Sequence, residues 1–265
     1  NLFVDTTSGS SHYITKVTPA GVVTSNWGTA SGGRTAIVTD SSGNVFAGAD
    51  TGTPRSVEKF TSSGGSPAAT ITVTTNGIPS AGMKADSSGN VWYISEGGSG
   101  NKVGKIAAGS ATTTEASVSG QLCGLTVGSD GAVYVGRIAS GTMSVLKFDG
   151  ASFTNSATPS ATYSIGAVNN QCPMATDGTY LYIARDTSFM SRLLIASPNT
   201  LDANWVNTPG TGRYVQMGSD GKIYIGAQVS GMGGPSGAVW VVTTGGQLST
   251  LASFSSQPYD MVIDS

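Results

Sequence analysis

Short apolar runs that alternate with polar residues flank a recurring turn built on aspartate and glycine. The pattern occurs around five aspartates: TDSSGNVFAG (Asp40), ADSSGNVWYI (Asp86), GSDGAVYVG (Asp130), TDGTYLYIA (Asp177) and GSDGKIYIG (Asp220). A turn of this composition between two alternating apolar runs is a strong β-hairpin signal. The pattern therefore predicts a hairpin at each of these aspartates.

Each hairpin belongs to a longer repeat. The aspartates are 43 to 47 residues apart, and Asp264 near the end of the chain continues the series. A third apolar run carries a lysine in four copies, and a short fourth run follows it; these lysines are Lys16, Lys59, Lys105 and Lys147. Four short strands in about 40–45 residues are typical of one blade of a β-propeller.

The two chain ends complete the count of repeats. The final MVIDS resembles a first strand without its second, and the opening NLFV resembles a second strand without its first. We therefore expect one all-β domain over residues 1–265, a six-bladed β-propeller with four antiparallel strands per blade. The C-terminal strand (258–265) is expected to close it by pairing with the N-terminal strands, because closure removes exposed sheet edges.

The recurring side chains are expected to be structural. Aspartate and glycine stabilise tight turns, since the carboxylate bonds nearby backbone and glycine tolerates left-handed geometry. Aromatic residues at matching places in the second strands are interpreted as packing between blades; these are Trp92, Tyr134, Tyr182 and Tyr224.

Composition narrows the classes of function. Of the 265 residues, 11% are charged and the net charge is −2, so no basic surface of the kind that binds nucleic acid is expected. No apolar run approaches the roughly 20 residues of a membrane helix, so membrane insertion is not expected. Low charge with many Ser and Thr residues is common in secreted, cell-surface and virion proteins, and we expect such a location.

Residues 82–120, GMKADSSGNVWYISEGGSGNKVGKIAAGSATTTEASVSG, contain the sharpest copy of the repeat. A D-x-x-G-N-hydrophobic-W turn is followed by N-K-hydrophobic-G-K-I. This segment resembles the NHL-repeat-type propellers and, more narrowly, the streptogramin B lyase-like group. The resemblance implies a propeller fold. In the lyases of that group it also implies a proton-transferring histidine beside glutamates that hold magnesium.

The chain departs from that catalytic pattern. Gly97 and Gly98 directly follow Glu96, and no histidine is near them. His12 is the only histidine, has no glutamate beside it in sequence, and is interpreted as a solvent-exposed loop residue. A single histidine also excludes a zinc site with three histidine ligands. No catalytic residue is therefore assigned.

Loops at one end of the blades are expected to surround the mouth of a central channel, where a ligand could bind. Amide, guanidinium and phenol groups there suit hydroxyl-rich or peptide ligands. Asp50 and Glu96 could instead hold calcium or magnesium as a cofactor, and a hydrated rim without a ligand is the third alternative. The candidate ligand-binding residues are Arg34, Gln121, Gln171, Arg213, Gln257 and Tyr259.

Two further stretches stand out. Cys123 and Cys172 start first strands in neighbouring repeats, where a disulfide is geometrically feasible if the Cα atoms lie within about 7 Å. Two buried free thiols are the alternative. The glycine-rich residues 226–240 are predicted to form a long loop, either a mobile flap or an adaptable contact surface.

Three functions remain open. We favour a non-catalytic binding or adhesion propeller that is secreted or surface-displayed and recognises a glycan or protein partner through the channel mouth. The first alternative is a metal-dependent lyase or hydrolase of the streptogramin lyase or gluconolactonase type, which would use Glu96, Asp50 and His12. The second is a structural module of a larger extracellular or virion assembly.

Overall fold

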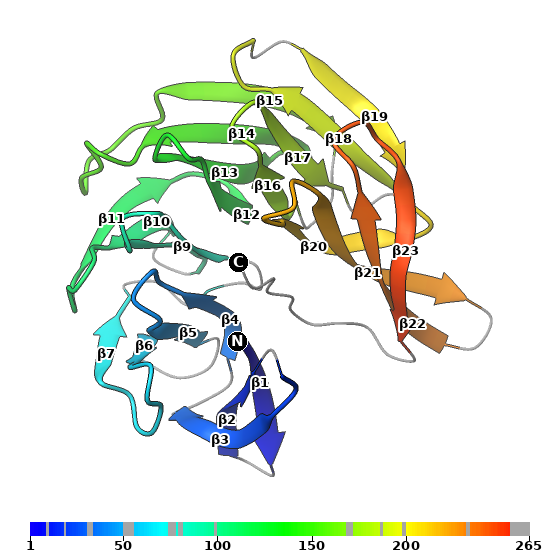
Figure 1. Cartoon of the computed structure of the whole chain (residues 1–265). Coiled ribbons are helices and arrows are strands. Elements are labelled where there is room, and N and C mark those ends of the chain that lie inside the picture. Colours follow the sequence, from blue (N-terminus) through cyan, green and yellow to red (C-terminus); the bar gives the residue numbers. More distant parts are fainter. Residues whose placement is uncertain are drawn as a thin grey trace. The chain divides into compact units, whose positions relative to one another are not determined.

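Figure 1 shows the computed structural model of the chain. The structure describes residues 1–8, 11–18, 20–30, 34–49, 56–73, 78, 82–97, 100–167, 172–185, 188–197, 200–231 and 234–254. The chain divides into two compact units. The N-terminal unit comprises Asn1–Ser119 with Ala151–Thr158, and the C-terminal unit comprises Gly120–Gly150 with the described part of Pro159–Ile263. No helix long and apolar enough to cross a membrane occurs among the described residues.

The N-terminal unit contains three antiparallel sheets (Figure 1). A three-stranded sheet consists of β1 (Leu2–Ser8), β2 (Ser11–Val17) and β3 (Val23–Ala30). Blade 1 consists of β4 (Arg34–Thr39), β5 (Val45–Ala49), β6 (Ser56–Phe60) and β7 (Ala69–Thr72). Blade 2 consists of β8 (Met83–Ala85), β9 (Val91–Ser95), β10 (Asn101–Ile106) and β11 (Thr113–Val118).

The C-terminal unit contains three four-stranded antiparallel blades. Blade 3 consists of β12 (Gln121–Val127), β13 (Ala132–Ala139), β14 (Thr142–Asp149) and β15 (Ala161–Ala167). Blade 4 consists of β16 (Met174–Thr176), β17 (Tyr180–Ala184), β18 (Phe189–Leu194) and β19 (Leu201–Asn207). Blade 5 consists of β20 (Thr211–Met217), β21 (Ile223–Gly231), β22 (Gly234–Val242) and β23 (Leu248–Phe254).

The prediction of six four-stranded blades closed by the C-terminal strand is wrong. The structure has five four-stranded blades and one smaller sheet, in which β1 is an edge strand that pairs only with β2 among the described strands. Residues 258–265, the predicted closing strand, lie outside the described residues. The prediction of a sixth blade came from treating the two partial repeats at the chain ends as one complete blade. Periodicity identifies strands but not which distant segments pair, because bringing distant segments together costs closure entropy that a local pattern does not reflect.

The aspartate turns have the predicted structural role. Asp40 Oδ1 accepts hydrogen bonds from the backbone N–H groups of Ser42 and Asn44, each at 2.9 Å, and the Asn44 side chain donates to Oδ2 at 2.8 Å. Gly43 in this turn has a φ of 76°, which a residue with a side chain rarely adopts. The Asp86 turn repeats this arrangement. The carboxylate therefore fixes the hairpin rather than remaining available for chemistry.

The recurring lysines of blades 1 to 3 pack against the aromatic residues of the second strands. Lys105 Nζ lies 5.0 Å from the ring centroid of Trp92, and Lys59 Nζ lies 5.3 Å from that of Phe46. In blade 4, whose sequence lacks the lysine, Arg192 occupies the position. These contacts are cation–π interactions, each worth about 0.5–1 kcal/mol where solvent reaches them.

Blade 2 has a specific core fit. Gly104 pairs with Tyr93 across β10 and β9, and a Cβ at Gly104 would lie 2.1 Å from Tyr93 Cζ. The Tyr93 hydroxyl donates to Glu115 Oε1 at 2.6 Å. Burial of Tyr93, together with this bond and the charge of Glu115, raises the pKa of its hydroxyl well above the usual range. The absent side chain of the glycine thus makes room for a buried aromatic ring.

The core of the C-terminal unit lies between its blades. One apolar cluster joins blade 3 to blade 4, and a second joins blade 4 to blade 5. Tyr134, Val145, Leu181 and Ile183 belong to the first cluster, while Trp240 belongs to the second. Each fully buried side chain of this size contributes about 1.5–3 kcal/mol, so these interfaces dominate the stability of the unit.

Candidate functional site: one end of the C-terminal unit

The candidate site lies at the end of the C-terminal unit where first strands begin and second strands finish. β-Bulges interrupt the pairing there, between Leu122 and Gly124 in blade 3 and between Gly212 and Tyr214 in blade 5. A bulge leaves one residue outside the regular ladder and re-aims its side chain. The two residues placed in this way are Cys123 and Arg213.

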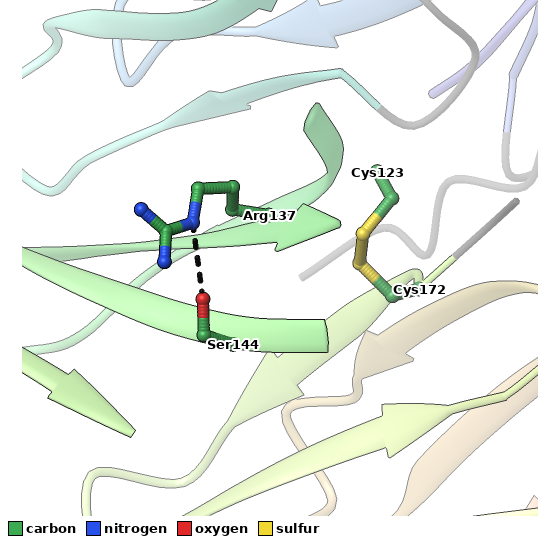
Figure 2. The surroundings of a disulfide bond; sticks show 4 residues. All are labelled: Cys123, Arg137, Ser144 and Cys172. Atoms are coloured by element: carbon green, nitrogen blue, oxygen red, sulfur yellow. Dashed lines mark hydrogen bonds between the residues drawn. A yellow bond between two sulfur atoms is a disulfide. The ribbon is translucent and has the colours of Figure 1, made fainter. Parts of the chain in front are cut away.

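Cys123 and Cys172 form a disulfide, which joins blade 3 to the segment preceding β16 (Figure 2). Their Cα atoms lie 5.1 Å apart, and Cys172 N–H donates to the Cys123 carbonyl at 3.0 Å. A Cβ at Gly136 would lie 2.1 Å from Cys172 Sγ, and one at Gly124 would lie 2.1 Å from the Cys172 carbonyl oxygen. The two neighbouring glycines are therefore required by the bridge, and the chain contains no free cysteine.

Arg213 and Gln228 are brought together at this end of blade 5. Arg213 Nη2 donates to Gln228 Oε1 at 2.7 Å, and both side chains are half-buried. The bulge presents the guanidinium, and the end of β21 supplies the amide. The amide NH₂ of Gln228 and the other N–H groups of Arg213 are donors of the kind that bind hydroxyl or carbonyl oxygens of a ligand.

Two more arginines lie at the corresponding ends of blades 3 and 4. Arg137 Nε donates to Ser144 Oγ at 3.2 Å on the adjacent strand, as Figure 2 shows. Arg185 directly follows β17 and donates through Nη2 to the Ala167 carbonyl oxygen. The Nε of Arg185 is buried and has no hydrogen-bond partner among the described residues. Both arginines thus donate to neutral oxygens, and neither forms a salt bridge with a described carboxylate.

Contacts between the blades show that these groups share one end of the unit. The backbone bond between the two cysteines joins blade 3 to blade 4, and a Cβ at Gly212 would lie 2.7 Å from Ala184 Cβ. Gly212 precedes Arg213, and Ala184 precedes Arg185. The end therefore combines three guanidinium groups with at least one amide.

Only part of the predicted ligand set lies within the described residues. Gln121 is exposed at the first position of β12, opposite Ile138. Arg34 begins β4 in the N-terminal unit, where only its backbone is described. The other members of the set lie outside the described residues, as does the proposed metal ligand Asp50; they are Gln171, Gln257 and Tyr259.

The candidate catalytic residues of the N-terminal unit are only partly placed. Glu96 directly follows β9 and is half-buried. His12 lies within β2, opposite Thr7 and Ala30, and its Nδ1 is buried without a hydrogen-bond partner among the described residues. The interpretation of His12 as an exposed loop residue is therefore wrong. No group of three or more His, Cys, Asp and Glu side chains gathers as metal ligands in the described part of the chain.

Sequence analysis missed Arg185 as a site residue. The signal was present, because the strand endings YVGR137 and YIAR185 place an arginine at the same distance from the aspartate-turn tyrosine. The arginine recurs in only two of the repeats, so the periodic pattern did not mark this position as a site residue.

The fold is shared with solved structures of β-propellers. Neither a protein-family model nor a curated protein sequence matches the chain. A putative 6-phosphogluconolactonase from Bacteroides uniformis is similar with a TM-score of 0.67 and 12% identity, over 97% of this chain and 82% of that one. A streptogramin B lyase structure is similar with a TM-score of 0.57 and 18% identity, over 82% and 68% of the two chains.

A third similar structure is a catalytically inactive virginiamycin B lyase from Staphylococcus aureus with quinupristin. Its TM-score is 0.57 at 13% identity, over 94% of this chain and 73% of that one. Similarity at such low identity shows the fold alone. The chain is an all-β propeller that shares its architecture with lyase and lactonase structures.

Proposed function

We propose that this protein is a non-catalytic binding propeller of the NHL-repeat type that recognises a glycan or protein partner. The donor-rich end of the C-terminal unit supports the proposal. Arg137 and Arg185 donate to neutral acceptors there, and neither pairs with a carboxylate of the described residues. Arg213 and Gln228 add a guanidinium and an amide within hydrogen-bond distance of each other. Such groups bind hydroxyl, carbonyl and carboxylate oxygens.

The proposed location is extracellular, at a cell surface or on a virion. The bridge between Cys123 and Cys172 supports it, because structural disulfides persist mainly in oxidising compartments.

Alanine substitution tests the proposed surface. The triple variant Arg137→Ala/Arg185→Ala/Arg213→Ala is expected to lose binding on a glycan array, or binding to a protein partner that the unaltered protein captures. Its unfolding temperature should stay near that of the parent. Lys222→Ala is the matched control, because Lys222 pairs with Asp220 at 2.7 Å at the opposite end of blade 5. Undiminished binding by the triple variant would remove this surface from consideration.

A metal-dependent lyase or hydrolase is the second candidate, because the similar structures include a streptogramin B lyase and a putative lactonase. It would use Glu96 and Asp50 to hold calcium or magnesium and His12 to move a proton. The buried Nδ1 of His12, which lacks a partner among the described residues, gives this candidate its specific support. Magnesium- or calcium-dependent turnover that disappears in Glu96→Gln would favour this candidate over binding alone.

A further inference from the structure

Blade 4 contains a group of aromatic and charged side chains far from the donor-rich end. Tyr182, Arg192 and Asp202 are direct cross-strand partners in β17, β18 and β19. They therefore lie in one row on one face of the sheet. Arg192 Nη2 lies 3.8 Å from Asp202 Oδ2, and Tyr182 donates its hydroxyl to Asp177 Oδ2 at 2.7 Å.

An irregularity in β19 adds a tryptophan to this row. The register shifts between Met190 and Arg192, which leaves extra residues of β19, including Trp205, unpaired in the ladder. Such a shift re-aims side chains, and Trp205 reaches the Arg192 face. Its ring centroid lies 5.0 Å from that of Tyr182 and 5.0 Å from Arg192 Cζ.

The guanidinium of Arg192 lies over two aromatic rings. It is 4.7 Å from the centroid of Tyr180 in addition to its contact with Trp205, and Nη1 donates to the Thr244 carbonyl in blade 5 at 3.4 Å. The blade 4 aromatic platform consists of Tyr180, Arg192 and Trp205, and both of its rings pack against the fully buried ring of Tyr182. Because the guanidinium holds the rings in place, little side-chain entropy remains to be lost when a ligand binds.

The platform differs from the equivalent positions of other blades. In blades 1 to 3 a lysine covers a single aromatic ring that is almost fully buried: Trp92 is 0% and Tyr134 is 1% exposed. The equivalent ring of blade 4, Tyr182, is also 0% exposed, but Tyr180 and Trp205 beside it are partly exposed. Among the described residues, no hydrogen-bond partner exists for Trp205 Nε1 or the Tyr180 hydroxyl, and neither atom is buried. Structural packing therefore accounts for the buried rings and for part of the surface of Tyr180 and Trp205, but it leaves these two donors without a partner among the described residues.

We propose that the blade 4 aromatic platform is a binding site for a neutral saccharide. The apolar face of a pyranose ring packs on the exposed parts of the Tyr180 and Trp205 rings, and its hydroxyls accept from the indole N–H and bond the phenol. Asp202, whose side chain is 51% exposed, supplies an acceptor for sugar hydroxyls. The carboxylates of Asp177 and Asp202 offset the charge of Arg192, so the platform favours a neutral sugar over an acidic one. The site is separate from the donor-rich end and does not depend on the proposed function.

The indole N–H signal of Trp205 gives a direct test. In a ¹⁵N-labelled protein it is assigned as the indole signal that Trp205→Phe removes, among the four tryptophans of the chain. Titration with cellobiose, lactose and maltose at millimolar concentrations is expected to shift this signal saturably. Trp205→Phe and Tyr180→Phe each remove one hydrogen-bonding group, and each is expected to weaken binding by about tenfold as followed by calorimetry.

Controls separate the role of the site from folding. Arg192→Lys introduces the residue found at this position in blades 1 to 3, so it should fold normally. It loses the planar contact with two rings and should therefore weaken binding. Lys147→Ala, which removes the matching cation in blade 3, should leave the shift of the Trp205 signal unchanged. An unshifted Trp205 signal with all three disaccharides would overturn the proposal, and so would a shift caused only by acidic sugars.

Discussion

The fit between the disulfide and Gly136 gives the sharpest test of the structure. Cys123 and Cys172 are 49 residues apart in sequence. A Cβ on Gly136 would lie too close to the Sγ atoms of both cysteines. In the chain-entropy model, a bridge closing a loop of this length stabilises the folded state by about 4 kcal/mol. The double variant Cys123→Ala/Cys172→Ala is therefore expected to lower the free energy of unfolding by about 2–4 kcal/mol, because residual structure in the unfolded chain reduces the ideal value.

Gly136→Ala tests the geometry itself. Its Cβ would lie 2.1 Å from Cys172 Sγ and 3.0 Å from Cys123 Sγ, distances that the folded structure cannot accept without moving the bridge. In the cysteine-free background both sulfur atoms are absent, so the same substitution should cost less. The expected coupling free energy between the two changes is about 1–3 kcal/mol, the range found for groups in contact.

Equilibrium unfolding in urea measures all four variants of this cycle: the parent, Gly136→Ala, the cysteine-free protein and the combination. The parent in a thiol reductant serves as a second route to the unbridged state. If the effects of the two changes add without coupling, the packing of Gly136 against the bridge is not as the structure has it. If reduction leaves the parent as stable as before, the bridge makes no contribution to folding.

Two predictions concern blade 2. Gly104→Leu alone should destabilise the fold by about 3 kcal/mol, because the leucine side chain would collide with the ring of Tyr93. Adding Tyr93→Val should recover stability, because blade 3 has valine opposite leucine at this position. Thermal unfolding checks this, and a double variant less stable than either single one would contradict it. Burial alone would raise the pKa of Asp86, but hydrogen bonds from Asn90, Trp92 and the turn backbone outweigh it and hold the pKa below its usual 3.8. The resulting stability is present above the pKa of the unfolded chain and is lost as the pH falls through the folded pKa, so Asp86→Asn should flatten the decline of stability on acidification below about pH 4.

Local patterns were sufficient for the blade motif. The aspartate turns formed as expected because each depends on residues within a few positions of one another, as Asp40 and Asn44 show. The lysines were correctly treated as structural, since the cross-strand register that places Lys105 on Trp92 follows from the hairpin.

The glycine-rich residues 226–240 show where local composition misleads. They were predicted to form a loop, but β21 extends to Gly231 and β22 begins at Gly234. Glycine lowers strand propensity, yet pairing of the two segments outweighs that preference, because propensity in sheets depends strongly on context.

The sequence by itself determined the repeat, the hairpins and the all-β class, because these depend on contacts between near neighbours along the chain. Only the tertiary structure decided that the described residues form five full blades, that Cys123 and Cys172 are bridged, and that a bulged strand brings Trp205 onto Arg192. Each of these depends on residues that are distant in sequence or on a one-position shift in register. A periodic pattern contains no information about either, because a register shift changes which side chains meet without changing the order of polar and apolar residues.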